Sequence, residues 1–158
     1  MRLSSGLIGL PVVSACAITA AAQPAVKRVL TLDEAKRVIA AAEAEAARNA
    51  WPSVIAVVDD GGWLIALERM DNPPMLASVE LAPGKARTAA LFRKPTATLE
   101  QAIDTGRVAA ATAPGFVEMQ GGIPLVKEGQ VVGAIGVSTD TPAHDEQIAE
   151  AGAKALAP

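Results

Sequence analysis

The sequence has 158 residues, of which 51% are hydrophobic and 20% are charged, proportions that are typical of one globular domain and exclude a disordered or collagen-like chain. The formal net charge is -3 at pH 7, so there is no basic excess to attract phosphate backbones, and nucleic acid is not an expected partner. Only 3% of the residues are aromatic and none is Tyr, which predicts a core of small aliphatic side chains.

Residues 1–22 have the pattern of a cleaved signal peptide. Arg2 gives a positive start, an uncharged and largely apolar run follows, and alanines at 20–22 form a small-residue cleavage site. Glycine and proline interrupt the run, which is short for a membrane span of about 20 residues. We therefore expect a periplasmic or secreted protein with a short leader over 23–29 and one domain over 30–158.

Cys16 is the only cysteine, and it lies inside this first segment. The mature domain is therefore expected to have no disulfide, no cysteine-bound zinc and no cysteine nucleophile. An alternative stays open, because Val-Ser-Ala-Cys at 13–16 resembles a bacterial lipobox in which the cysteine becomes lipidated. Only in that case do we expect attachment to a membrane.

The mature chain is predicted to begin with an amphipathic helix and a β-hairpin. Thr31 and Glu34 fit a capping box, and apolar residues recur at helical spacing as far as Asn49. The β-branched run 53–58 is joined by an Asp-Asp-Gly-Gly turn to a second apolar run at 63–68. This arrangement is typical of two antiparallel strands.

The rest of the chain is predicted to be helical at first and then rich in strands. A helix is expected over 76–92, kinked or restarted at Pro83, and a second capping box predicts another helix from Thr98 to about Ala111. The remaining elements are three strands and a closing helix, expected at 116–119, 123–126, 131–137 and 143–156. With hairpins in place of crossovers, this order predicts an antiparallel sheet with helices packed on it.

Catalytic signatures are mostly missing from the sequence. It contains no G-x-S-x-G elbow, P-loop, H-E-x-x-H or dinucleotide-binding glycine pattern. His144 is the only histidine, so one chain cannot supply a two-histidine metal site, and we interpret it as a solvated residue at the start of the last helix. Asp145 and Glu146 are a candidate acid/base pair, but the dipole of a helix N-terminus explains both without chemistry.

The segment 81–96 is the most unusual part of the chain. On a helix, Lys85, Thr88 and Phe92 fall on one face, and neighbouring alanines leave little side-chain bulk beside them. A flat ligand or another subunit could approach such a surface closely. Ordinary close packing of a helix on a sheet explains the same pattern.

Three motifs occur in order along the chain: Lys-Ala-Arg-Thr-Ala at 85–89, Gly-Gly-Ile-Pro-Leu at 121–125, and Gly-Ala-Ile-Gly-Val-Ser at 133–138. Together they resemble the GlcG/HbpS-type haem-binding family, which is related to the C-terminal domain of PduO. The resemblance implies an α+β fold, a single-domain α/β sandwich of profilin-like or PAS-like type with a five-stranded antiparallel sheet and packed helices. It also implies homo-oligomers and binding of haem or a related tetrapyrrole.

The same resemblance implies a haem site on the segment 81–96. Its motif threonine corresponds to Thr88, which would lie at or beside the haem iron as a weak oxygen ligand. The residues implied in binding the rest of the haem are Lys85, Arg87 and Arg93 for the propionates, with Phe92 and Met119 as packing groups, Met119 also as a soft axial group.

The expected function is that of an exported haem-binding protein for haem sensing, sequestration or delivery, with slow haem degradation as a side activity. One alternative is a small-molecule enzyme or accessory protein that uses the same pocket, with Lys85 and His144 or a carboxylate as acid/base groups. The other is a partner-binding module that uses the alanine-rich surface as its interface.

Overall fold

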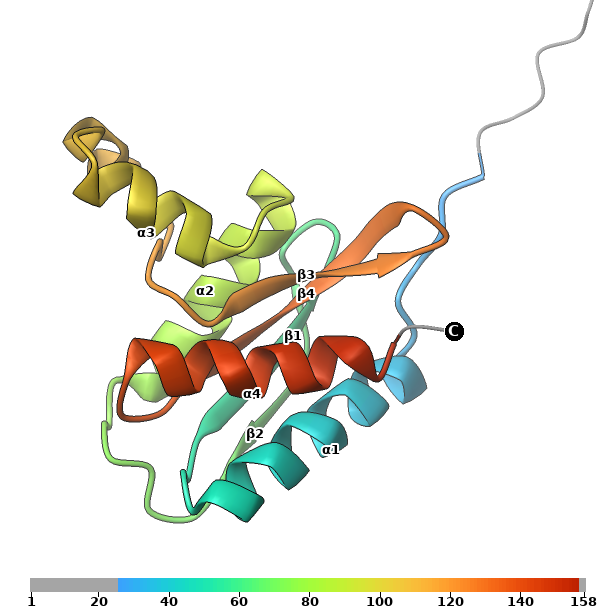
Figure 1. The fold of residues 1–158 in the computed structure, drawn as a ribbon. Helices are drawn as coiled ribbons and strands as arrows, with labels where there is room; N and C mark the ends of the chain where they lie inside the picture. Colours follow the sequence, from blue (N-terminus) through green and yellow to red (C-terminus); the bar gives the residue numbers. More distant parts are fainter. Residues whose placement is uncertain (1–25, 157–158) are drawn as a thin grey trace, which may run out of the picture.

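A four-stranded antiparallel sheet forms the middle layer of the fold in the computed structural model, which describes residues 26–156 (Figure 1). The elements in chain order are α1 (Leu32–Asn49), β1 (Val54–Asp59), β2 (Leu64–Arg69), α2 (Ser78–Phe92), α3 (Thr96–Asp104), the 3-10 helix η1 (Val108–Thr112), β3 (Gly122–Lys127), β4 (Gln130–Ser138) and α4 (Pro142–Lys154). The strand order is β2-β1-β4-β3, so the two central strands, β1 and β4, are neighbours in the sheet although they are far apart in the sequence.

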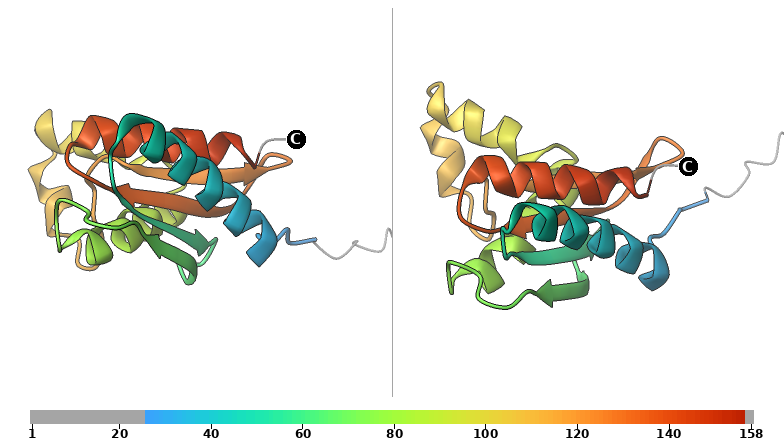
Figure 2. Two further views of the ribbon diagram at one scale, coloured as in Figure 1. Left: turned by 90° about the horizontal axis from the view of Figure 1, so that it is seen from below. Right: turned by 60° about the horizontal axis from the view of Figure 1, so that its bottom comes forward.

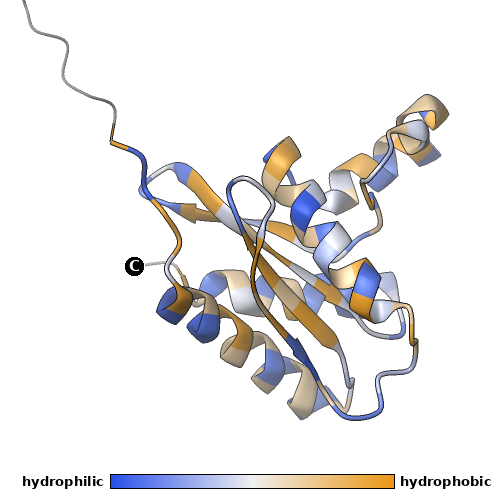
Figure 3. Cartoon of the chain, turned by 180° about the vertical axis from the view of Figure 1, so that it is seen from behind, coloured by the Kyte–Doolittle hydropathy of each residue, from blue (hydrophilic) through white to orange (hydrophobic). Residues whose placement is uncertain are grey.

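The central strands are buried because helices cover both faces of the sheet. Helices α1 and α4 lie side by side on one face, and α2 lies on the other (Figure 2). Alternate residues of β1 serve the two faces, with Ile55 and Val57 in the core under α1 and α4, and Val58 in the smaller core under α2. Hydrophobic residues accordingly dominate the central strands (Figure 3). The predicted antiparallel sheet and the β1–β2 hairpin are confirmed.

Helix α2 lies unusually close to the sheet. A Cβ atom added at Gly136 in β4 would lie 2.1 Å from the carbonyl oxygen of Ala82, and one at Gly122 in β3 would lie 2.5 Å from that of Lys85. Only glycine fits at such distances, since real Cβ atoms do not approach other heavy atoms so closely. The alanine-rich face of α2 is thus packed on the sheet, which is the ordinary close packing that the sequence left open beside a ligand-binding or subunit-binding surface.

The expectation of five strands is wrong, because residues 116–119 form no strand. Gly115 precedes them with a φ of 81°, and the amide of Val117 donates to the hydroxyl of Thr88 at 2.8 Å. The Val117 amide therefore bonds to a side chain of α2 instead of to a neighbouring strand.

The helices after residue 76 also differ from the prediction. Helix α2 does not restart at Pro83, which lies inside it. The predicted helix from Thr98 to Ala111 is two shorter elements: α3 begins at Thr96, and Gly106, with a φ of 117°, separates it from η1. The second capping box, predicted at Thr98 and Gln101, is absent because Thr98 lies inside α3, whose N-cap is Pro95.

The predicted signal peptide and the lipobox at 13–16 lie outside the described residues. Within 26–156, no helix combines the length and the apolar character that a membrane crossing requires.

Candidate functional site

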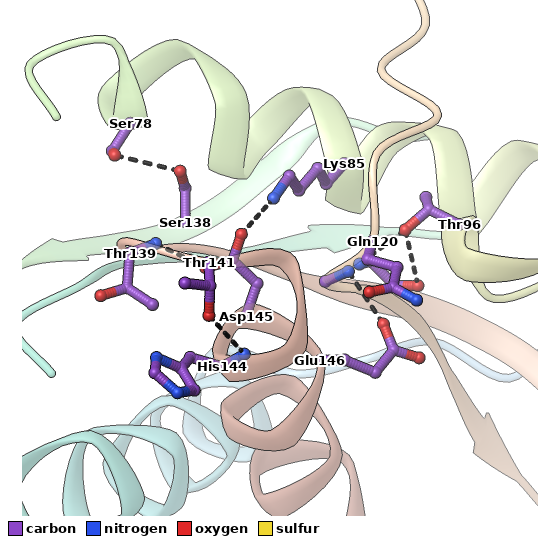
Figure 4. A network of polar contacts seen from close by, with 12 residues as sticks. Ser78, Lys85, Thr96, Gln120, Ser138, Thr139, Thr141, His144, Asp145 and Glu146 are labelled. Atoms are coloured by element: carbon purple, nitrogen blue, oxygen red, sulfur yellow. Dashed lines mark hydrogen bonds and ion pairs between the residues drawn. The ribbon is translucent and has the colours of Figure 1, made fainter. Parts of the chain in front are cut away.

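A buried ion pair joins α2 to α4. The Lys85 ammonium lies 2.5 Å from Oδ2 of Asp145, and the side chains are only 1% and 5% exposed (Figure 4). Oδ1 of the same carboxylate accepts from the Thr139 amide at 2.5 Å. Burial raises the pKa of Asp145, although the Lys85 charge and the Thr139 amide act in the opposite direction. The sequence does not indicate this pairing: Lys85 was expected to bind a propionate, and Asp145 to be an acid/base or helix-dipole residue.

Thr88 is fully buried, and its hydroxyl is engaged inside the chain. It donates to the carbonyl oxygen of Gly84 at 2.8 Å and accepts from the amide of Val117 at 2.8 Å. Val117 also packs on Gly84, where an added Cβ would lie 2.5 Å from a Val117 methyl group. A ligand therefore reaches the Thr88 hydroxyl only if the segment carrying Val117 moves away.

Three side chains hold the loop that precedes β3. The Gln120 amide donates to Glu100 at 3.0 Å, the Gly121 amide to Glu146 at 2.8 Å, and the Gly122 amide to Thr96 at 2.8 Å. Burial raises the pKa of Glu146, and so do the charges of Glu150 and Glu100, although the Gly121 amide and the Lys85 charge act in the opposite direction. Glu146 is thus more than a helix-dipole residue, because it fixes the Gly-Gly-Ile-Pro-Leu motif. No local sequence signal indicates the roles of Thr96 and Glu100.

The predicted propionate partners point to separate places. Lys85 is in its buried pair, and the Arg87 guanidinium lies over the Trp63 ring, 5.9 Å from its centroid. Arg93 ends α2 with a φ of 55° and lines a polar hollow of about 470 Å³ together with Lys27 and other residues. The structure does not bring these three cations together.

Phe92 borders an apolar hollow beyond the end of α2. Its ring meets that of Phe116 edge-on, with centroids 5.0 Å apart. The hollow has a volume of about 250 Å³ and is lined by Phe92, Lys94, Leu99, Ala102, Arg107, Ala110, Ala113 and Glu118. Met119, the next residue after Glu118, is 40% exposed.

His144 lies in the first turn of α4, as expected, but its ring is stacked on that of Trp51, with centroids 3.6 Å apart. Its Nδ1 lies 2.7 Å from Oδ1 of Asp140, and this hydrogen bond lowers the pKa of Asp140. The ring is turned away from Lys85 (Figure 4), so the two residues do not form an acid/base pair. Among the described residues, no three His, Cys, Asp or Glu side chains cluster as metal ligands.

Comparison with known proteins identifies the family. The family model described as "Haem degrading protein HbpS-like" matches residues 30–154. The chain belongs to the HbpS-like family. Its similarity to Protein GlcG of Escherichia coli K12 reaches 46% identity over 112 residues, which cover 71% of this chain and 83% of GlcG. The predicted family resemblance is thereby confirmed.

Solved structures of similar proteins share the fold. A double mutant of Streptomyces reticuli HbpS has 30% identity and a TM-score of 0.78, covering 90% of this chain and 99% of HbpS. A structure of PduOC in complex with haem has 27% identity and a TM-score of 0.74, covering 81% of this chain and 95% of PduOC.

Proposed function

We propose that this HbpS-like chain is an exported protein that binds haem. The observation that carries the proposal is the shared fold with PduOC, a relative solved as a haem complex with a TM-score of 0.74. The apolar hollow beside Phe92 supports it, because tetrapyrroles need aliphatic and aromatic walls.

The proposed site includes Phe92, Met119 and Thr88. Phe92 and Met119 are partly exposed, at 41% and 40%, and offer apolar contact. Thr88 would supply an oxygen ligand to the haem iron if Val117 withdrew from its hydroxyl, since that amide would then no longer occupy the acceptor oxygen. Lys85 is not available to a propionate in this site, because its ammonium neutralises the buried Asp145.

A homo-oligomer completes the proposed site. The hollow of about 250 Å³ is smaller than the roughly 300–1,000 Å³ of sites that enclose a small molecule. Several large apolar side chains lie on the surface, including Trp63 at 72% and Leu76 at 83% exposure, and such groups favour association. Light scattering of residues 23–158 should therefore give a mass of two or more chains, and a monomer at micromolar concentration contradicts this part.

The proposed role is haem sensing, sequestration or delivery outside the cytoplasm. A threonine oxygen is a weaker and more exchangeable iron ligand than histidine or thiolate, which suits uptake and release. Slow haem degradation is the proposed side activity, supported by the family's description as haem degrading. Degradation is measured as the loss of the Soret band of the complex in air with a reductant, and free hemin under the same conditions is the control.

Hemin titration tests the proposed function. Residues 23–158 should shift the Soret band of hemin and saturate, and Thr88→Val should give a different spectrum because it removes the oxygen ligand while keeping the shape. Thr105→Val is the matched control, since this exposed hydroxyl bonds only within α3. Absence of a Soret shift with the unchanged sequence overturns haem binding, and identical spectra for Thr88→Val and the unchanged protein overturn the ligand assignment.

Export has its own test. Protein recovered from the periplasm should begin at Gln23, the residue after the alanines at 20–22. A mature N-terminus at Cys16 carrying a lipid would instead identify a lipoprotein, and an intact N-terminus in the cytoplasm would overturn export.

A further inference from the structure

The hollow beside Phe92 has two cationic side chains on its lining that sequence analysis did not single out. Lys94 follows the end of α2, and Arg107 lies between α3 and η1. The remaining walls are mostly small or aliphatic, with Leu99, Ala102, Ala110 and Ala113. An apolar chamber with positive charges at its border fits a ligand that is apolar in the middle and anionic at the edge.

Neither cation has an ion-pair partner among residues 26–156. The ion pairs of the described chain involve Lys27, Arg28, Arg48, Lys85, Lys127, His144 and Lys154. Lys94 and Arg107 are therefore free to bind a carboxylate without breaking an existing ion pair. This separates them from Lys85, which cannot leave Asp145 without stranding a buried charge.

One carboxylate, that of Glu118, also lines the hollow. Together the three charged side chains leave a net positive charge, so the border attracts an anion, although Glu118 reduces the attraction. Removing the charge of Glu118 should consequently strengthen anion binding, whereas removing that of Lys94 or Arg107 should weaken it.

We propose that Lys94 and Arg107 bind the carboxylates of a tetrapyrrole whose ring edge occupies the hollow beside Phe92. This inference rests on the proposed function and replaces the propionate partners that the family resemblance implies. The volume of about 250 Å³ holds only part of such a ring, so the carboxylate-bearing edge is fixed by this chain and the opposite edge projects from the hollow.

The test compares hemin with the dimethyl ester of iron protoporphyrin, which has the same ring but no carboxylate. Dissociation constants are measured by Soret titration of residues 23–158. Lys94→Gln and Arg107→Gln should each weaken hemin binding about fivefold, as expected for a partly exposed charge pair, and the double variant should weaken it about 25-fold. Binding of the dimethyl ester should be unchanged in all three variants.

Two further variants serve as controls. Arg93→Gln removes the adjacent cation, which lines a different hollow, and should leave the affinity for hemin unchanged. Glu118→Gln should tighten hemin binding and leave that of the ester unchanged. Raising the salt concentration should weaken hemin binding of the unchanged protein and have little effect on the double variant.

The outcomes separate this inference from the proposed function. If the unchanged protein binds hemin and the double variant binds it equally well, the assignment of Lys94 and Arg107 is overturned while haem binding stands. A loss with Arg93→Gln that matches the loss with Lys94→Gln also overturns it. If the unchanged protein binds neither hemin nor the ester, the proposed function and this inference both fall.

Discussion

Lys85 and Asp145 show how one buried charge depends on another. Both side chains are nearly inaccessible to water. The loss of hydration is compensated by the attraction between the two charges and by the hydrogen bond from the Thr139 amide to Asp145. Lys85→Met should therefore destabilise the fold by about 3–5 kcal/mol, because it leaves the Asp145 carboxylate buried without its cation. Urea unfolding of the unchanged and substituted proteins measures this difference.

A double variant distinguishes loss of the pair from loss of packing. Lys85→Met with Asp145→Asn removes both charges, and the amide oxygen of Asn can still accept from Thr139. It should recover much of the stability lost in Lys85→Met. If the double variant is as unstable as the sum of the two single variants, the charges are not coupled and this account is wrong.

At the scale of elements, the contact between α2 and the sheet depends on glycine. Gly136→Ala would place a methyl group 2.1 Å from the Ala82 carbonyl oxygen, so α2 would have to move off β4. We expect a loss of about 1–3 kcal/mol or more in the free energy of unfolding, as seen for overpacked cores. Gly61→Ala is the control, because its new methyl group meets mainly the exposed Trp63 ring at 3.2 Å. Equal effects in urea unfolding would contradict the close-packing argument.

The start of α1 carries a pH-dependent connection to the sheet. Glu34 completes the capping box with Thr31 and accepts from Lys127 at the end of β3. These hydrogen bonds, that from Lys127 foremost, lower the pKa of Glu34 from 4.5 to about 2. The unfolded state therefore binds the proton more readily, so the contribution of Glu34 to stability is present above pH 4.5 and is lost as the pH falls toward 2.

Glu34→Gln tests this connection. The variant should be less stable than the unchanged protein at pH 7, and the difference should shrink as the pH falls from 4.5 to 2, because the unchanged side chain then becomes neutral too. Thermal unfolding across this range gives the comparison, with Asp33→Asn, at the neighbouring exposed carboxylate, as control. A difference that does not depend on pH would show that the charge of Glu34 contributes nothing.

Across the whole molecule, local sequence patterns predicted the features that are formed by residues close together in the sequence. The capping box of α1 and the β1–β2 hairpin join residues that are close in sequence, and both are confirmed. Lys85 and Asp145 are 60 positions apart, so no local spacing indicated their pairing. The segment 116–119 has strand-like composition, but the amide of Val117 donates to Thr88, a partner that only the packed fold provides. The hollow and its two cations depend on the placement of α3 and η1 and were missed for the same reason.

The molecule is unevenly packed, and this determines where it should open first. In β1 five of six residues are buried, whereas α3 buries only Thr96 and η1 buries none. Figure 1 shows α3 and η1 standing out from the sheet beyond α2. Segments with few buried apolar contacts open locally at low free energy, so their amides should exchange hydrogen fastest, and those of β1 and β4 slowest.

Haem should change this pattern in one region only. If the ring edge occupies the hollow between α2 and the α3–η1 segment, the bound ligand adds apolar contacts there, and hydrogen exchange over residues 96–119 should slow while that of β1 stays the same. The Lys94→Gln/Arg107→Gln variant, measured at the same hemin concentration, should show less slowing because a smaller fraction of its molecules has hemin bound. Slowing confined to α1 and α4 would place the ligand on the opposite face of the sheet and contradict the site proposed beside Phe92.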